Sequence, residues 1–124
     1  MGSEAGTSTT TGLQNVAMGR GALFTADSGE SNNVAIGMFG MYSVDNDGSD
    51  DNICLGVNAG KGGTGTFNRN VAIGTVALEN SAGNATYNNV AIGYNSANDL
   101  SGGHSNVMVG YGTGDVATTS SGSV

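Results

Sequence analysis

The hexapeptide NNVAIG occurs at residues 32–37 and again at residues 88–93, and a near copy, RNVAIG, occupies residues 69–74. The last five letters recur in looser form six times along the chain. They read NVAMG at 15–19, NVAIG at 33–37, NICLG at 52–56, NVAIG at 70–74 and at 89–93, and NVMVG at 106–110. Successive asparagines are 18, 19, 18, 19 and 17 residues apart. A period this regular over most of a 124-residue chain is typical of a repeat protein.

The first position of this word is always asparagine and the fifth is always glycine. The asparagines are Asn15, Asn33, Asn52, Asn70, Asn89 and Asn106. The glycines are Gly19, Gly37, Gly56, Gly74, Gly93 and Gly110. Side-chain amides at equivalent positions of stacked strands can bond to one another, and glycine tolerates the backbone conformation of a sharp corner. We therefore predict a ladder of asparagines between coils and a corner of the chain at each glycine.

The three middle positions are apolar and predict a short strand. The second and fourth positions hold large residues, mostly Val and Ile, which favour strands, and the third position is small. Successive strand residues point to opposite faces, so the large residues share one face. We expect the large residues to fill the inside of the coil and the small ones to face a neighbouring subunit. That predicted trimer interface consists of Ala17, Ala35, Cys54, Ala72 and Ala91.

Stacked units of this kind predict an all-β fold, a parallel β-solenoid of about six coils. Each coil of ~18 residues would rise by one strand spacing, about 4.8 Å. One such coil encloses little volume, so we expect three identical chains to pack together as a homotrimer. In this interpretation residues 1–11 form a flexible N-terminal arm, residues 12–114 the repeat domain, and residues 115–124 a polar C-terminal tail.

Composition excludes several classes of protein. The chain has 3 Lys and Arg against 10 Asp and Glu, a net charge of −7, so no basic face for nucleic acid can form. With 23 Gly, no Pro and 37% hydrophobic residues, it is a poor candidate for a helical bundle. No apolar run reaches the length needed to span a bilayer, so we expect no membrane insertion. Cys54, the single cysteine, reads as a small apolar residue in an alanine position.

The repeats resemble a known family. NNVAIG, RNVAIG and NVAMGRGAL (residues 15–23) resemble the SVAIG head repeat of trimeric autotransporter adhesins, the YadA-like group. They equally resemble the NTAIGYNAL repeats of phage tail fibres and related virion proteins, and NVAIGYNSA at residues 89–97 is the best match. The resemblance covers about residues 12–114. It implies a left-handed parallel β-roll wound as a homotrimer, a surface-binding role and no catalytic residues. The period of this chain is longer than that of the adhesin coil.

Three functions are compatible with these patterns. We expect a phage virion component, a short trimeric fibre or capsid decoration protein made in the host cytoplasm, because no secretion signal, stalk or anchor is visible. The alternative is the head fragment of an adhesin on a bacterial surface. A monomeric ice-binding or surface-binding solenoid ranks third, because the threonine clusters at residues 7–11 and 118–119 lie at the ends. Expected partners are the chain itself, other virion proteins, or a cell-surface glycan or protein. We do not expect an enzyme, since no paired carboxylates suit a glycan-cleaving groove.

One segment is a candidate metal site. VDNDGSDDN, residues 44–52, holds Asp45, Asp47, Asp50 and Asp51 beside a turn glycine. Closely spaced carboxylates of this kind could coordinate Ca²⁺, although the spacing only partly matches a calcium loop and no bidentate Glu follows. The alternatives are a solvated acidic loop or an exposed patch for a partner. No other cofactor is expected.

The remaining motifs are weaker. Gly60, Gly62 and Gly65 match a dinucleotide-binding glycine pattern, but no helix pattern follows them, so we expect a loop. His104, the single histidine, is expected to be a polar loop residue. Tyr94 and Tyr111 each follow a corner glycine directly. Stacked there, the two rings could form a platform for a sugar, or they could pack over the corner.

Overall fold

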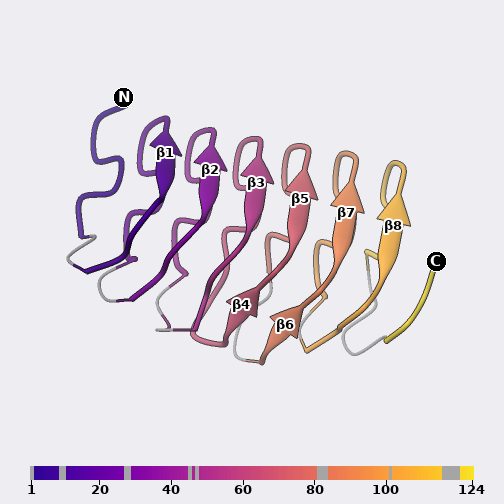
Figure 1. Cartoon of the computed structure of the whole chain (residues 1–124). Helices are drawn as coiled ribbons and strands as arrows, with labels where there is room; N and C mark the ends of the chain where they lie inside the picture. Colours follow the sequence, from indigo (N-terminus) through magenta and orange to yellow (C-terminus); the bar gives the residue numbers. More distant parts are fainter. Residues whose placement is uncertain are drawn as a thin grey trace.

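The protein is an all-β parallel solenoid in which the chain winds through about five full turns (Figure 1). The computed structural model describes residues 2–8, 11–26, 29–44, 46, 48–80, 84–100, 102–115 and 121–124. None of these residues is helical, in agreement with the all-β fold expected from the repeat. Each copy of the five-letter word supplies one strand. The chain makes one full turn between successive strands, so six strands correspond to five turns.

A six-stranded sheet forms one wall of the solenoid. Its strands, in spatial order, are β1 (Val16–Met18), β2 (Val34–Ile36), β3 (Ile53–Leu55), β5 (Val71–Ile73), β7 (Val90–Ile92) and β8 (Val107–Val109). Every neighbouring pair is parallel, and equivalent letters of the word face each other, as in Cys54 opposite Ala72. The repeat period therefore sets the strand register directly.

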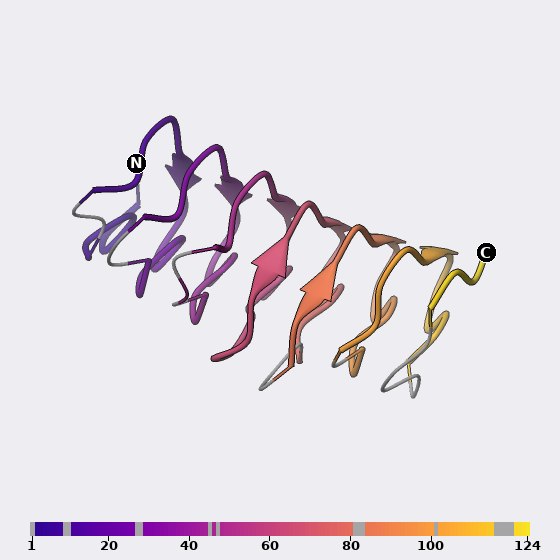
Figure 2. The same ribbon diagram turned by 60° about the horizontal axis from the view of Figure 1, so that its bottom comes forward.

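A second, smaller sheet lies on another side of the coil (Figure 2). It consists of β4 (Phe67–Asn68) and β6 (Thr86–Tyr87), which pair in parallel. The remaining wall is made of turns that follow each corner glycine. These turns are also bonded from coil to coil, for example from the Leu23 amide to the Gly40 carbonyl at 3.0 Å. Backbone hydrogen bonds thus tie neighbouring coils together on every side.

The corner glycines allow close stacking at the end of each strand. Their φ angles lie between +117° and +140°, a region that residues with a Cβ rarely adopt. A Cβ on Gly37 would also overlap the backbone of Gly56 in the next coil. The structure places all six predicted glycines at these corners. The conformation favours glycine at all six, and at the first five the backbone of the next coil leaves no room for a Cβ.

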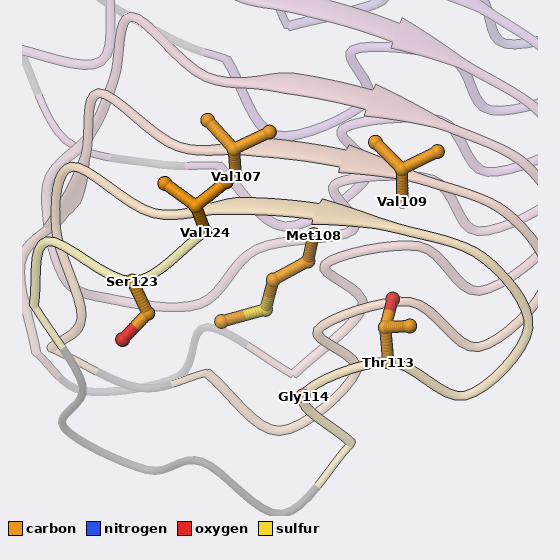
Figure 3. Close-up of a pocket in the computed structure, with 7 residues that line it drawn as sticks. All are labelled: Val107, Met108, Val109, Thr113, Gly114, Ser123 and Val124. Carbon is orange, nitrogen blue, oxygen red and sulfur yellow. The ribbon is translucent and has the colours of Figure 1, made fainter.

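The inside of the coil is the face of the sheet that carries the small residues. Ala35, Cys54, Ala72 and Ala91 have no exposed surface within the single chain, and Met108 is 8% exposed. Figure 3 shows the alternation at the last strand, where Met108 points into the coil while Val107 and Val109 point away from it.

Two expectations from the sequence are therefore wrong. The large apolar residues do not fill the coil, and Ala35, Cys54, Ala72 and Ala91 cannot form a trimer interface because they are already enclosed by their own chain. Ala17, partly buried, packs against the same core. The physical reason is that the coil is narrow. A larger residue of the opposite wall occupies the interior, so the strand has room only for a small residue there.

That opposite wall supplies the fourth residue after each corner glycine. Leu23, Met41 and Leu78 occupy this position and are completely buried. Where the strand carries a larger side chain, the same position is glycine. A Cβ on Gly60 would overlap the Cys54 sulfur, and one on Gly114 would overlap the Met108 sulfur. At these five strands a large residue therefore faces a small one, which balances the volume across the coil. At the remaining strand both residues, Ala91 and Ala97, are small.

The described residues at both ends of the chain are bonded to the outermost coils, and the flexible arm and tail expected from the sequence stay predictions. Residues 2–8 form turns on the first coil, where the Gly6 amide donates to the Ala22 carbonyl at 2.8 Å. At the other end the Val107 amide donates to the Ser123 carbonyl at 2.7 Å. Both segments extend the solenoid, while residues 1, 9–10 and 116–120 lie outside the described residues.

Candidate functional site

The asparagine column forms a continuous ladder inside the solenoid. The Asn52 Nδ2 donates to Asn33 Oδ1 at 2.9 Å, and the backbone amide of Asn70 donates to Asn52 Oδ1 at 2.8 Å. The same pattern runs from Asn15 to Asn106, and Asn106 Oδ1 accepts the Ser123 amide at 2.9 Å. Because these amides are engaged with neighbouring coils, the ladder holds the stack together and offers no ligand site.

The outer face of the six-stranded sheet is apolar along its whole length. It carries the second and fourth letters of each word, two from each strand. We call this surface the apolar face; it consists of Val16, Met18, Val34, Ile36, Ile53, Leu55, Val71, Ile73, Val90, Ile92, Val107 and Val109. None of the twelve is buried, and Met18 is 50% and Val109 62% exposed. Contiguous apolar patches on this scale mark interaction surfaces.

Tyr94 and Tyr111 stack on each other beside this face. Their ring centroids are 5.5 Å apart and their planes differ by 13°. The side chains are strongly exposed, 54% for Tyr94 and 81% for Tyr111. The two rings therefore form an exposed stack and are not packed under other residues.

A second aromatic group lies on the turns that follow the corner glycines of the first coils. We call Phe24, Phe39 and Tyr42 the aromatic cluster. Tyr42 stacks on Phe24, with centroids 5.0 Å apart and planes within 5°. Phe39 meets Tyr42 edge-on, at 5.1 Å and 85°. A cavity of about 240 Å³ opens between Phe39, Tyr42 and Lys61.

The sequence interpretation missed this cluster as a site. Phe24 and Tyr42 each stand five residues after a corner glycine, and Lys61 takes the same position in the next coil. That shared column was a usable signal. The contribution of Phe39, from a different position of the turn, could not be anticipated without the turn geometry.

The acidic loop is only partly described. Asp45 and Asp47 lie outside the described residues. Asp50 Oδ1 accepts the Ser31 amide at 2.7 Å, a contact between neighbouring coils, and Asp51 is exposed. In the described part of the chain, no three His, Cys, Asp or Glu side chains converge to hold a metal ion. Calcium binding by this loop stays a prediction.

The remaining motifs have structural explanations. A Cβ on Gly62 would overlap the Val44 side chain, and one on Gly65 would overlap the Asn84 backbone, so these glycines permit close packing between coils. His104 stacks on Tyr87 at 4.9 Å, and its Nε2 lies 3.0 Å from the Ser121 hydroxyl. His104 thus continues the contact between coils toward the C-terminal end.

The interior of the solenoid opens at the last strand. A cavity of about 470 Å³ lies there, and Figure 3 shows Met108 pointing into it. Its lining residues are Val107, Met108, Val109, Thr113, Gly114, Ser123 and Val124. This cavity lies beside β8, the last strand of the sheet, and is therefore the open end of the solenoid interior.

Cys54 gives a test of the interior. Burial raises the pKa of its thiol well above the usual range, and a hydrogen bond with the Ala72 backbone offsets this only in part. Because the thiolate is the reactive form, native protein is expected to react with a maleimide about 100-fold more slowly than unfolded protein. Thiol labelling with and without denaturant measures this. Equal labelling rates for native and unfolded protein would mean that Cys54 is exposed at the surface.

No helix in the described part of the chain is long and apolar enough to cross a membrane. The chain matches no protein-family model, no curated protein and no solved structure. The fold and its surfaces are therefore the basis for assigning a function.

Proposed function

We propose that this chain is a non-enzymatic structural and binding protein of a phage virion. In this role it is a short trimeric fibre or a capsid decoration protein that mediates attachment or particle assembly. The apolar face is the observation that carries the proposal. It is a continuous ladder, about 24 Å long if six strands stand ~4.8 Å apart, and its apolar side chains are available for association along its whole length.

A second copy of the same chain is the natural partner of this surface. Each strand presents the same two apolar positions, so identical chains match one another coil for coil. Most soluble oligomers are symmetric assemblies of identical chains, so we expect copies of the same chain to bury this surface. We retain the homotrimer expected from the sequence but assign its interface to the apolar face, since the alanine column is enclosed within each chain.

Two features of the sequence favour a virion protein over an adhesin head. The repeat at residues 89–97 resembles the phage fibre repeat most closely, and the spacing of 17–19 residues exceeds the adhesin period. The proposal of a non-enzymatic role rests on the two described cavities. Their lining residues are mainly apolar or aromatic and include no pair of carboxylates.

Native mass tests this assignment. Sedimentation of the chain is expected to give a species of three times 12.2 kDa. Replacing Ile53, which is 42% exposed at the centre of the apolar face, by lysine is expected to lower the mass to a single chain. Three lysines brought together at an apolar interface would be desolvated and would repel one another.

Thr64→Lys is the matched control, because Thr64 is exposed in a loop of the same coil. This variant should keep the mass of the parent protein. A parent chain that sediments at 12.2 kDa at all concentrations would contradict the trimeric fibre, as would an Ile53→Lys protein that retains the full mass.

A further inference from the structure

The cavity beside the aromatic cluster has two walls at right angles. Tyr42 has one ring face covered by Phe24, at 5.0 Å, so its other face is turned toward the next coil, which carries Lys61. Phe39 stands perpendicular to Tyr42, at 85°, and forms the second wall. The result is an apolar corner that is open to solvent and bordered by a cation.

Two of the three cations of this acidic chain lie near the aromatic cluster: Lys61 lines the cavity, and Arg20 lies over the Phe39 ring. The Arg20 guanidinium carbon is 5.6 Å from the centroid of Phe39. Arg20 comes from the first coil, the rings from the first two, and Lys61 from the third. The coils that carry the two cations are therefore two strand spacings apart along the axis of the solenoid, about 9.6 Å.

Both cations are only loosely paired. Lys61 Nζ lies 3.9 Å from Glu79 Oε1, and Arg20 Nε lies 3.9 Å from Glu4 Oε2. Glu79 has better partners, since it accepts hydrogen bonds from Asn58 Nδ2 at 2.8 Å and from Asn98 Nδ2 at 3.3 Å. Partly exposed ion pairs of this length contribute little, so both cations can turn toward an anion at small cost.

We propose that the cavity between Phe39, Tyr42 and Lys61 binds one acidic sugar, a six-membered ring that carries a carboxylate. This inference deepens the proposed function and rests on it, because it makes the site a receptor contact for attachment. The C–H face of the ring packs into the corner of Phe39 and Tyr42. The carboxylate pairs with Lys61.

The shape of the corner favours a sugar over a flat aromatic anion. A planar ligand can stack face to face on one ring only and meets the other edge-on, because the planes of Phe39 and Tyr42 differ by 85°. A puckered sugar ring has apolar C–H groups on its face and along its edge, and so can contact both rings. The volume of about 240 Å³ is below the ~300–1,000 Å³ of typical drug-sized pockets and suits one sugar unit.

Saturation-transfer NMR with glucuronic acid and N-acetylneuraminic acid tests the site, with glucose as the neutral comparison. Both acids are expected to bind weakly, with Kd in the millimolar range, and at least about 10-fold more tightly than glucose. Lys61→Gln is expected to remove this preference, and Phe39→Ala to abolish the signal for both acids. Tyr111→Ala, which removes an exposed ring far from this corner, should bind as the parent does.

Two results would overturn the inference: no saturation transfer to either acid, or binding that Lys61→Gln and Phe39→Ala both leave unchanged. Circular dichroism of each variant checks that the coil is intact, and Lys61→Gln serves as the safer variant because Lys61 is partly exposed. Sedimentation of the same samples separates this inference from the proposed function. A trimer without acid binding refutes the site alone, whereas a monomer that binds acid refutes the trimeric fibre alone.

Discussion

Replacing Ala72 by glutamate is expected to prevent the chain from folding. Ala72 is completely buried at the middle of the sheet, on the face that lines the coil. The neighbouring strands place Cys54 and Ala91 directly beside it, and neither can neutralise a carboxylate. An unpaired buried charge is among the few changes that cost more than ~4 kcal/mol, a large share of the ~5–15 kcal/mol stability of a typical domain.

The adjacent residue is the matched control. Ile73 belongs to the same strand but lies on the apolar face and is only partly buried. Ile73→Glu is expected to keep the β-sheet spectrum by circular dichroism and to lose self-association in sedimentation. A folded Ala72→Glu protein, or a failure of Ile73→Glu alone to fold, would reverse the assignment of inner and outer faces.

Replacing Asn52 by leucine is expected to lower the free energy of unfolding by about 2–6 kcal/mol. Asn52 Nδ2 donates to the Phe67 carbonyl at 2.7 Å, and its Oδ1 accepts the Asn70 amide at 2.8 Å. Leucine has a similar size but leaves both backbone groups without this partner. A buried group that loses its hydrogen bond costs about 1–3 kcal/mol, and two backbone groups lose theirs. Urea denaturation at a fixed protein concentration measures the loss.

Asn80→Ala is the control for this change. Asn80 is exposed, and its Nδ2 donates to Asp99 Oδ1 at 2.7 Å across the surface. Exposed contacts of this kind usually change stability by less than ~0.5 kcal/mol. Comparable midpoints for the Asn52→Leu and parent proteins would mean that the asparagine ladder contributes little to the stack.

The strands and their register follow from the sequence because two positions of the word never vary in type. Asparagine and glycine at a fixed spacing mark the start and end of each strand, and equal spacing leaves one parallel register. The alternation of large and small residues also separates the two faces of the sheet correctly. It does not say which face is inside, because Val and Ala are both apolar.

The missing information lay in another column. Leu23, Met41 and Leu78 follow the corner glycines at one spacing, and glycine replaces them opposite Cys54 and Met108. The turn residue is thus small where the strand residue is large, and large where the strand residue is small. This pattern indicates that the two positions face each other across the coil. The stacked pair Tyr94 and Tyr111 could be anticipated, since both rings occupy one column. The corner formed by Phe39 and Tyr42 could not, because it depends on the path of the turn.

The direction of the hydrogen bonds has a mechanical consequence. Covalent chain runs around each coil, while the bonds between coils, such as Gly37 amide to Met18 carbonyl at 2.8 Å, run along the axis of the solenoid. A pull along the axis therefore loads the interfaces between coils in series, and the weakest interface sets the tensile strength. A squeeze along the axis presses the coils together, so a molecule built this way resists compression better than extension.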